Sequence, residues 1–184
     1  MPGTPLRLLA AAALAVALLA SHASTSAGAP DKGCATSALA LHQGPRVVPR
    51  TMQLPLMIEI VNDGRSACTL AGYPRIALLS SSGKVYPFAY RDGGDAEVTG
   101  HRPATVTLRP GGGAFVLINK NACIANVNGQ LARQVRLTPP GGTGTLTLRS
   151  LGGVFLDYCG AGDPGHRVDV SPIAASVSAA EHAR

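Results

Sequence analysis

Apolar and polar residues alternate over short stretches of this chain, and the clearest stretch runs from residue 53 to residue 61. Its aliphatic side chains share one face of an extended chain, with polar or mixed residues on the other; they are Leu54, Leu56, Ile58 and Ile60. A period of two is typical of a β-strand with one buried face. We therefore predict a strand here, ended by the Asn-Asp-Gly sequence that follows it.

The same alternation recurs downstream between turns rich in Gly, Pro and Asn, and no helical period of useful length interrupts it. This pattern predicts an all-β chain folded as a two-sheet β-sandwich of about seven to nine antiparallel strands. Segment 114–118 is apolar at every position, which indicates either a central strand or a strand covered on each side. The other predicted strands lie around 76–78, 105–109, 134–138, 145–149 and 167–171.

The N-terminus has the pattern of a secretory signal peptide. Arg7 precedes an unbroken run of 13 apolar residues, Leu8–Ala20. Ser21-His22-Ala23 then supplies a small-residue cleavage site, and Thr25-Ser26-Ala27 supplies a second one. A membrane-spanning helix needs about 20 apolar residues, so we expect no stable membrane span once the signal is cleaved. The prediction is a secreted protein that is extracellular or lies in the cell envelope.

We accordingly divide the chain into a signal peptide (1–23), a flexible lead-in (24–33), a β-sandwich domain (34–171) and a tail (172–184) that is frayed or forms a short helix. The lead-in and the tail are rich in small residues.

Four cysteines remain after the predicted cleavage: Cys34, Cys68, Cys123 and Cys159. An even number in an exported chain indicates two disulfides. Three pairings are possible, and we favour Cys34–Cys68 with Cys123–Cys159, because each then closes a local loop. A zinc site would bring its cysteines in closely spaced pairs, which this chain lacks, so we expect no metal site.

Charge gives little indication of a partner. The 184 residues carry 16 Lys and Arg against 10 Asp and Glu, a net charge of +6, and no three basic residues are adjacent. A nucleic-acid surface clusters its basic residues, so we predict no nucleic-acid partner. The expected partner is an unidentified protein or envelope component.

Fragments that imitate catalytic motifs fail on inspection. Residues 80–84 lack the glycine spacing of a phosphate-binding loop, and no G-x-S-x-G sequence is present. A Ser/His/Asp site can assemble from distant residues, and His166, near Asp163 and Asp169 in sequence, is its best candidate. That segment is rich in Gly and Pro and is better explained as a solvated turn. We therefore predict that the protein is not an enzyme, with no catalytic residues and no cofactor.

Three aromatic residues lie in one row: Tyr86, Phe88 and Tyr90. Their spacing places the rings on one face of a strand, and Pro87 between them favours a sheet edge. The rings either cover the edge of the core or form a contact stripe for a partner or a glycan. The absence of Trp argues against a carbohydrate platform.

The middle of the chain carries a recognisable order of features. The turn at 62–64 is followed by Cys-Thr-Leu-Ala-Gly-Tyr-Pro at 68–74, by Val-Thr-Leu-Arg-Pro-Gly-Gly at 106–112, and by Cys123. This order, over residues 34–171, resembles exported actinobacterial proteins grouped as domain of unknown function 4232. The resemblance implies a single immunoglobulin-like sandwich and no assigned activity. Many members are lipoproteins, whereas this chain lacks the cysteine that a lipid anchor needs.

From these features we expect an exported, non-enzymatic module that acts by surface contact. One alternative is a secreted protease inhibitor that presents a loop around 91–102 or 120–130. A less favoured alternative is a hydrolase with an inconspicuous Ser/His/Asp site.

Overall fold

The structure is a computed structural model that describes residues 32–94, 96–124 and 130–182. The predicted signal peptide (1–23) and most of the predicted lead-in (24–33) lie outside the described residues. Gly33, at the end of that lead-in, forms an isolated bridge with Thr69. Within the described ranges, no helix is both long and apolar enough to cross a membrane.

The regular structure in the described part of the chain is mostly β, with twelve strands, two single-turn 3-10 helices (Thr36–Ala38 and Pro164–His166) and one short α-helix. The elements are β1 (Leu39–Gln43), β2 (Leu56–Asn62), β3 (Cys68–Leu70), β4 (Arg75–Leu79), β5 (Ala89–Asp92), β6 (Val106–Leu108), β7 (Gly113–Asn119), β8 (Leu131–Ala132), β9 (Gln134–Thr138), β10 (Leu146–Leu148), β11 (Leu156–Asp157), β12 (Arg167–Val170) and α1 (Val177–Ala180).

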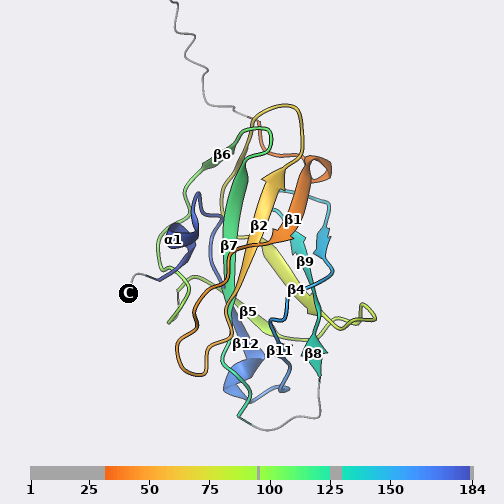
Figure 1. Ribbon diagram of the computed structural model, residues 1–184, viewed down its shortest axis with the longest axis vertical. Helices are drawn as coiled ribbons and strands as arrows, with labels where there is room; N and C mark the ends of the chain where they lie inside the picture. Colours follow the sequence, from red (N-terminus) through yellow and green to blue (C-terminus); the bar gives the residue numbers. More distant parts are fainter. Residues whose placement is uncertain (1–31, 95, 125–129, 183–184) are drawn as a thin grey trace, which may run out of the picture.

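Eight strands form the two sheets of a β-sandwich, the predicted fold class (Figure 1). The larger sheet has the order β1-β2-β7-β12-β5 and the smaller one the order β10-β9-β4. The remaining strands form two short ribbons, β3 with β6 and β8 with β11. These ribbons explain why the strand number exceeds the expected seven to nine.

The pairing of β5 with β12 corrects the expectation of wholly antiparallel strands. These two strands run parallel, with Arg167 opposite Ala89 and Val170 opposite Asp92. Antiparallel order follows from tight hairpins, whereas strands joined by a long crossover can run parallel. Since β6 to β11 separate β5 from β12 along the chain, no hairpin fixes their direction.

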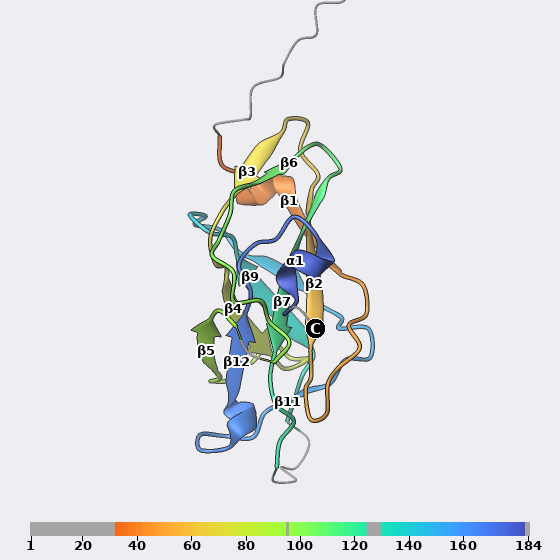
Figure 2. The same cartoon turned by 90° about the vertical axis from the view of Figure 1, so that its left-hand side faces the viewer.

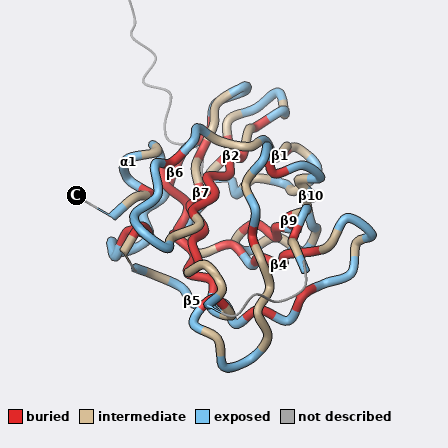
Figure 3. The backbone as a smooth tube through the Cα atoms, turned by 60° about the horizontal axis from the view of Figure 1, so that its bottom comes forward, coloured by how far each residue is buried: buried red, intermediate tan, exposed pale blue. Residues whose placement is uncertain are grey.

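The main core lies between the two sheets. Ile58 of β2 and Val116 of β7 meet Leu78 of β4 and Leu137 of β9 in one apolar cluster, and all four are fully buried. Buried backbone follows β2 and β7 through the molecule (Figure 3). The alternation that predicts the strands is therefore the alternation that fills this core.

The outer face of β2 and β7 is apolar as well, and the C-terminal segment covers it (Figure 2). Met57 and Leu117 point to this side and pack with Ala174 and with Ala180 of α1. Phe115 and Ala174 also exchange backbone hydrogen bonds. This covering confirms that 114–118 is a central strand buried on both sides. It also extends the domain past the boundary expected at 171, because the segment after it forms the short helix and contributes a second core.

The Asn-Asp-Gly turn predicted after β2 is held by the fully buried side chain of Asn62. Its amide Nδ2 donates to the carbonyl oxygens of Ser66 (2.9 Å) and Leu108 (3.0 Å), and its Oδ1 accepts from Gly64 N (2.9 Å). One side chain therefore joins this turn to the strand that precedes β7.

Candidate binding groove

A groove of about 460 Å3 lies between two loops at one side of the sandwich. One wall comes from residues 43–57, which connect β1 to β2, and the other from residues 152–155, which connect β10 to β11. Its lining is mainly apolar and includes Pro45, Leu54, Pro55, Val154 and Phe155. Its size falls within the range of small-molecule sites, about 300–1,000 Å3.

The first wall is a proline-containing loop tied to the body of the protein. Arg50 N donates to Glu97 Oε1 (2.6 Å), Leu54 N donates to Lys120 O (2.8 Å), and the carbonyl of Met52 accepts from Ala122 N (2.8 Å). At its start, a Cβ on Gly44 would lie 2.6 Å from Cγ of Met57, so only glycine fits there. Proline restricts the backbone further, and the wall is therefore preformed.

The second wall is a double-glycine turn. Gly152 and Gly153 have φ angles of 52° and 85°, which glycine adopts at little cost. A Cβ on Gly152 would collide with the side-chain amide of Gln43 at the end of β1. The side-chain amide of Gln43, which also lines the groove, therefore lies directly against this turn.

Large apolar side chains are exposed on and beside these walls. Phe155 is 53% exposed and lines the groove, while Val48 (67%) and Met52 (54%) lie on the first loop. Exposed apolar side chains that gather in one place indicate an interaction site more often than scattered ones do.

Met52 adopts a backbone conformation that suits glycine. It is the third residue of the turn Arg50–Gln53, closed by Gln53 N donating to Arg50 O (3.1 Å), and its φ is 63°. A side chain in this left-handed region costs about 1–2 kcal/mol. Strained positions of this kind cluster at binding sites.

We expect Met52→Gly to raise the free energy of unfolding by about 1 kcal/mol, because glycine removes this strain. Urea denaturation measures the change. Met52→Ala is the matched control, since it shortens the side chain but keeps a Cβ at the strained position. A glycine variant no more stable than the alanine variant contradicts the strain.

The charged residue of the groove is Arg46, and no carboxylate lines it.

A second hollow of about 240 Å3 lies on the other side of the double-glycine turn and shares Gly152, Gly153 and Val154 with the groove. Its charged residues are Arg133 and Arg149, again with no acid. The guanidinium of Arg133 lies over the ring of Phe155, 5.2 Å from its centroid.

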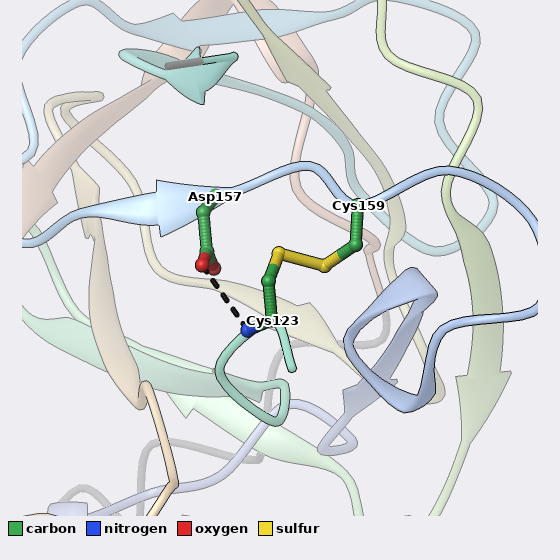
Figure 4. Close-up of side chains that lie close together, drawn as sticks. All are labelled: Cys123, Asp157 and Cys159. Atoms are coloured by element: carbon green, nitrogen blue, oxygen red, sulfur yellow. Dashed lines mark hydrogen bonds between the residues drawn. A yellow bond between two sulfur atoms is a disulfide. The ribbon is translucent and has the colours of Figure 1, made fainter. Parts of the chain in front are cut away.

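The four cysteines form the two disulfides Cys34–Cys68 and Cys123–Cys159, the local pairing favoured from the spacing. In the described part of the chain, sulfur and carboxylate atoms of Cys123, Asp157 and Cys159 come within 4.8 Å of one another (Figure 4). Both sulfurs are bonded to each other, and Asp157 Oδ2 accepts from Cys123 N (3.1 Å). The cluster is therefore a cross-link reinforced by a carboxylate.

A buried ion pair adjoins this disulfide. The side chain of Lys120 is 0% exposed, and its Nζ donates to Asp157 Oδ1 (2.6 Å) and to Asn121 O (2.5 Å). Burial lowers the pKa of Lys120, and the hydrogen bond and charge of Asp157 oppose that shift. Sequence reasoning missed this pair, because nothing in a single Lys after an apolar run shows that its charge is buried.

The three rings at 86–90 do not form an exposed stripe. Tyr86 and Phe88 are buried in the main core and pack on Tyr158, at ring distances of 5.4 and 5.0 Å. Only Tyr90 is exposed, by 36%. Of the two interpretations, the first fits Tyr86 and Phe88: their rings cover the edge of the core. The strand that follows them, β5, lies at the edge of its sheet, as Pro87 indicated.

Tyr90 connects the two sheets, because its hydroxyl accepts a hydrogen bond from Leu78 N of β4 (2.8 Å). Burial raises the pKa of Tyr90 from 10.0 to about 12, and the bond from Leu78 partly opposes the rise.

The unfolded chain therefore loses the Tyr90 proton near pH 10, while the folded protein keeps it until about pH 12. The resulting stability is complete below pH 10 and is lost as the pH rises through this window. We expect Tyr90→Phe to flatten this alkaline loss and to cost about 1 kcal/mol at neutral pH, because Leu78 N loses its acceptor. Urea midpoints measured across the window test this; parallel pH profiles for both proteins would contradict it.

His166 is the histidine that the sequence places nearest to two acids, Asp163 and Asp169. The Nδ1 atom of His166 is buried without a hydrogen-bond partner, and its ring lies 5.9 Å from that of Tyr158. Asp163 accepts from Gly165 N, and Asp169 pairs with Arg91 and Arg167. These contacts give both acids structural partners, and the hydrolase alternative stays a prediction.

The first loop considered for protease inhibition, 91–102, is exposed near both ends but buried in its centre. Glu97, Val98 and Thr99 are buried. Thr99 N donates to Ala180 O and His182 N donates to Glu97 O, so the C-terminal segment covers this stretch. In the second loop, residues 125–129 lie outside the described residues.

The groove residues were not singled out from the sequence. The signals that could have identified them are the prolines at 45, 49 and 55 and the Gly152-Gly153 pair, which imply fixed loops at a close approach. Neither signal shows that two loops 100 residues apart face each other.

The fold and its two cross-links define a small disulfide-linked β-sandwich domain. More specifically, the chain belongs to the family described as Domain of unknown function (DUF4232), whose model matches residues 34–174. This match confirms the family resemblance, and it continues into the segment that covers the outer face of the large sheet. No curated protein and no solved structure matches the chain.

Proposed function

We propose that this protein is an exported, non-enzymatic binding module that holds its partner in the groove between residues 43–57 and 152–155. The observation that carries the proposal is the groove itself, whose walls are preformed and whose lining is apolar with unopposed positive charge. Such a concave apolar surface with a few polar groups is the usual form of a binding site.

Export is supported by the two disulfides, which persist in oxidising compartments. We expect N-terminal sequencing of the protein recovered from the culture medium or envelope to begin near Ser24 or Gly28. Recovery of the uncleaved chain from the cytoplasm would contradict the proposed location.

Hydrogen exchange on the mature, oxidised protein tests the groove. Envelope and culture extracts from the producing cell are added in fractions, and amide protection is followed by mass spectrometry. The proposal expects an active fraction to protect residues 43–57 and 150–155 with saturation. The protection is lost in the double variant Arg46→Glu/Phe155→Ala, because it removes the groove's charge and its exposed ring.

Val85→Ala is the matched control, since Val85 is 45% exposed but does not line the groove. It is expected to behave like the wild type. Protection that appears elsewhere on the protein, or that survives in the double variant, would place the partner on another surface.

A further inference from the structure

We propose that the groove and the adjoining basic hollow together bind one anionic amphiphile, with its apolar chain in the groove and its carboxylate or phosphate group at Arg133 and Arg149. The inference rests on the proposed function, because it assigns a ligand class to the same groove.

The apolar part of the ligand follows from the groove lining. Its side chains are mainly aliphatic or proline, and Phe155 stands at its edge with half of its surface exposed. Removing this surface from water is favourable at about 25 cal/mol per Å2. A hydrocarbon chain meets this requirement, because it needs no hydrogen bonds from the lining.

The anionic part follows from the charges. Arg46 lines the groove, Arg133 and Arg149 line the hollow, and neither lining contains an Asp or Glu. The ion pairs in the described ranges use other residues, so these three arginines are not neutralised there. Ser81 and Ser150 also line this hollow. Guanidinium groups suit a carboxylate or a phosphate, because they donate paired, charge-assisted hydrogen bonds.

The position of Arg133 links the two parts. Its guanidinium lies over the Phe155 ring, 5.2 Å from the centroid, and this stacking holds a long side chain in place. Phe155 also lines the apolar groove. The Phe155 ring therefore contacts the guanidinium of Arg133 and also lines the groove that would hold the hydrocarbon chain of the ligand.

Gly152, Gly153 and Val154 form the wall between the two hollows. The side-chain amide of Gln43 lies against Gly152, whereas a Cβ on Gly153 would meet no atom within 4 Å. The open path for a ligand from one hollow to the other therefore runs over Gly153. A cationic amphiphile fits poorly, because it would meet three arginines.

The chain contains no Trp, so Phe155→Trp supplies a single fluorescent reporter at the site while keeping an aromatic ring beside Arg133. This protein is titrated with dodecanoate and with dodecyl phosphate below their micelle concentrations. The controls are dodecanol and dodecyltrimethylammonium, which carry the same chain with no charge or a positive charge. We expect a saturable blue shift for the two anions, at least about tenfold tighter than for either control.

Arginine variants are made in the same Trp background. Arg133→Gln/Arg149→Gln is expected to weaken anion binding at least about tenfold and to leave dodecanol binding unchanged. Arg109→Gln, an exposed arginine of the β6–β7 turn, is the matched control and should bind like the parent. Arg149→Gln alone is the second variant, because it leaves the stacking of Arg133 intact. Urea midpoints confirm that all of these variants are folded.

Vesicles distinguish the source of the anion. A blue shift with phosphatidylglycerol vesicles but not with phosphatidylcholine vesicles, in addition to binding of the soluble anions, indicates a membrane lipid headgroup. Binding of the soluble anions alone indicates a free amphiphile. Failure of both soluble anions to bind overturns the proposal, whatever the vesicles do.

The outcomes also separate this inference from the proposed function. Equal binding of dodecanol and the anions, or no loss in the arginine variants, refutes the anionic subsite while the groove remains a binding site. Extract-dependent protection of the groove without amphiphile binding likewise refutes only the ligand class. Protection absent from the groove refutes both.

Discussion

Asp157→Ala is expected to lower the free energy of unfolding by about 3–5 kcal/mol, because it leaves the buried ammonium of Lys120 without its counter-charge. Lys120 is 0% exposed, and after this change only the carbonyl of Asn121 accepts from its Nζ. The variant also removes the acceptor of Cys123 N. Guanidinium denaturation at neutral pH measures the loss.

Lys120→Met is the matched control and should cost far less. It removes the buried charge and fills most of the same volume, while Asp157 is 29% exposed and still accepts from Cys123 N. The double variant Lys120→Met/Asp157→Ala should therefore be more stable than Asp157→Ala alone. If adding Lys120→Met makes the Asp157 variant less stable still, Lys120 is not the source of the cost.

The stability of the Asp157→Ala variant should also depend on pH, and the direction follows from the pKa of Lys120. Because burial lowers the pKa of Lys120 below 10.5, the unfolded chain binds the proton more strongly than the folded protein does. Stability in the Asp157→Ala variant should consequently rise as the pH increases from that lowered pKa toward 10.5. In Lys120→Met/Asp157→Ala this rise should disappear.

Removing either disulfide is expected to lower the free energy of unfolding by about 3–4 kcal/mol, mainly because the unfolded chain gains freedom. The pairs Cys34–Cys68 and Cys123–Cys159 span 34 and 36 residues, so the two losses should be similar. The double variants Cys34→Ala/Cys68→Ala and Cys123→Ala/Cys159→Ala test this in urea. The denaturant slope should increase in both, since an uncrosslinked unfolded chain exposes more surface.

The two losses should also be additive, because the bridges lie at opposite ends of the molecule, beside β3 and beside β11 (Figure 2). Distant sites without shared partners usually combine within about 0.5 kcal/mol. A loss below about 1 kcal/mol for one bridge would mean that the unfolded chain is already compact there.

Local signals in the sequence predicted the fold class because each reports a short-range requirement. The alternation at 53–61 and 134–138 indicates strands, since one face of each must avoid water. The Asn-Asp-Gly turn is where the chain reverses, with Asn62 bonding its own turn. The local cysteine pairing follows from the short loops that it closes.

The three aromatic residues at 86–90 show what local sequence signals cannot predict. Spacing places Tyr86, Phe88 and Tyr90 on one face, but it does not show which face the molecule covers. The answer depends on Tyr158, which comes from a distant loop and packs on two of the rings.

By itself, the sequence determined that this protein is a disulfide-linked β-sandwich with its main core in the alternating aliphatic positions. Only the tertiary structure decided that the C-terminal segment covers the outer face of β2 and β7, that Lys120 is buried against Asp157, and that residues 43–57 and 152–155 face each other across a groove. The physical reason is that the period of the apolar residues reports which side of a strand is buried. A site is made by contacts between segments far apart in the sequence, and nothing in either segment shows which other segment it will contact.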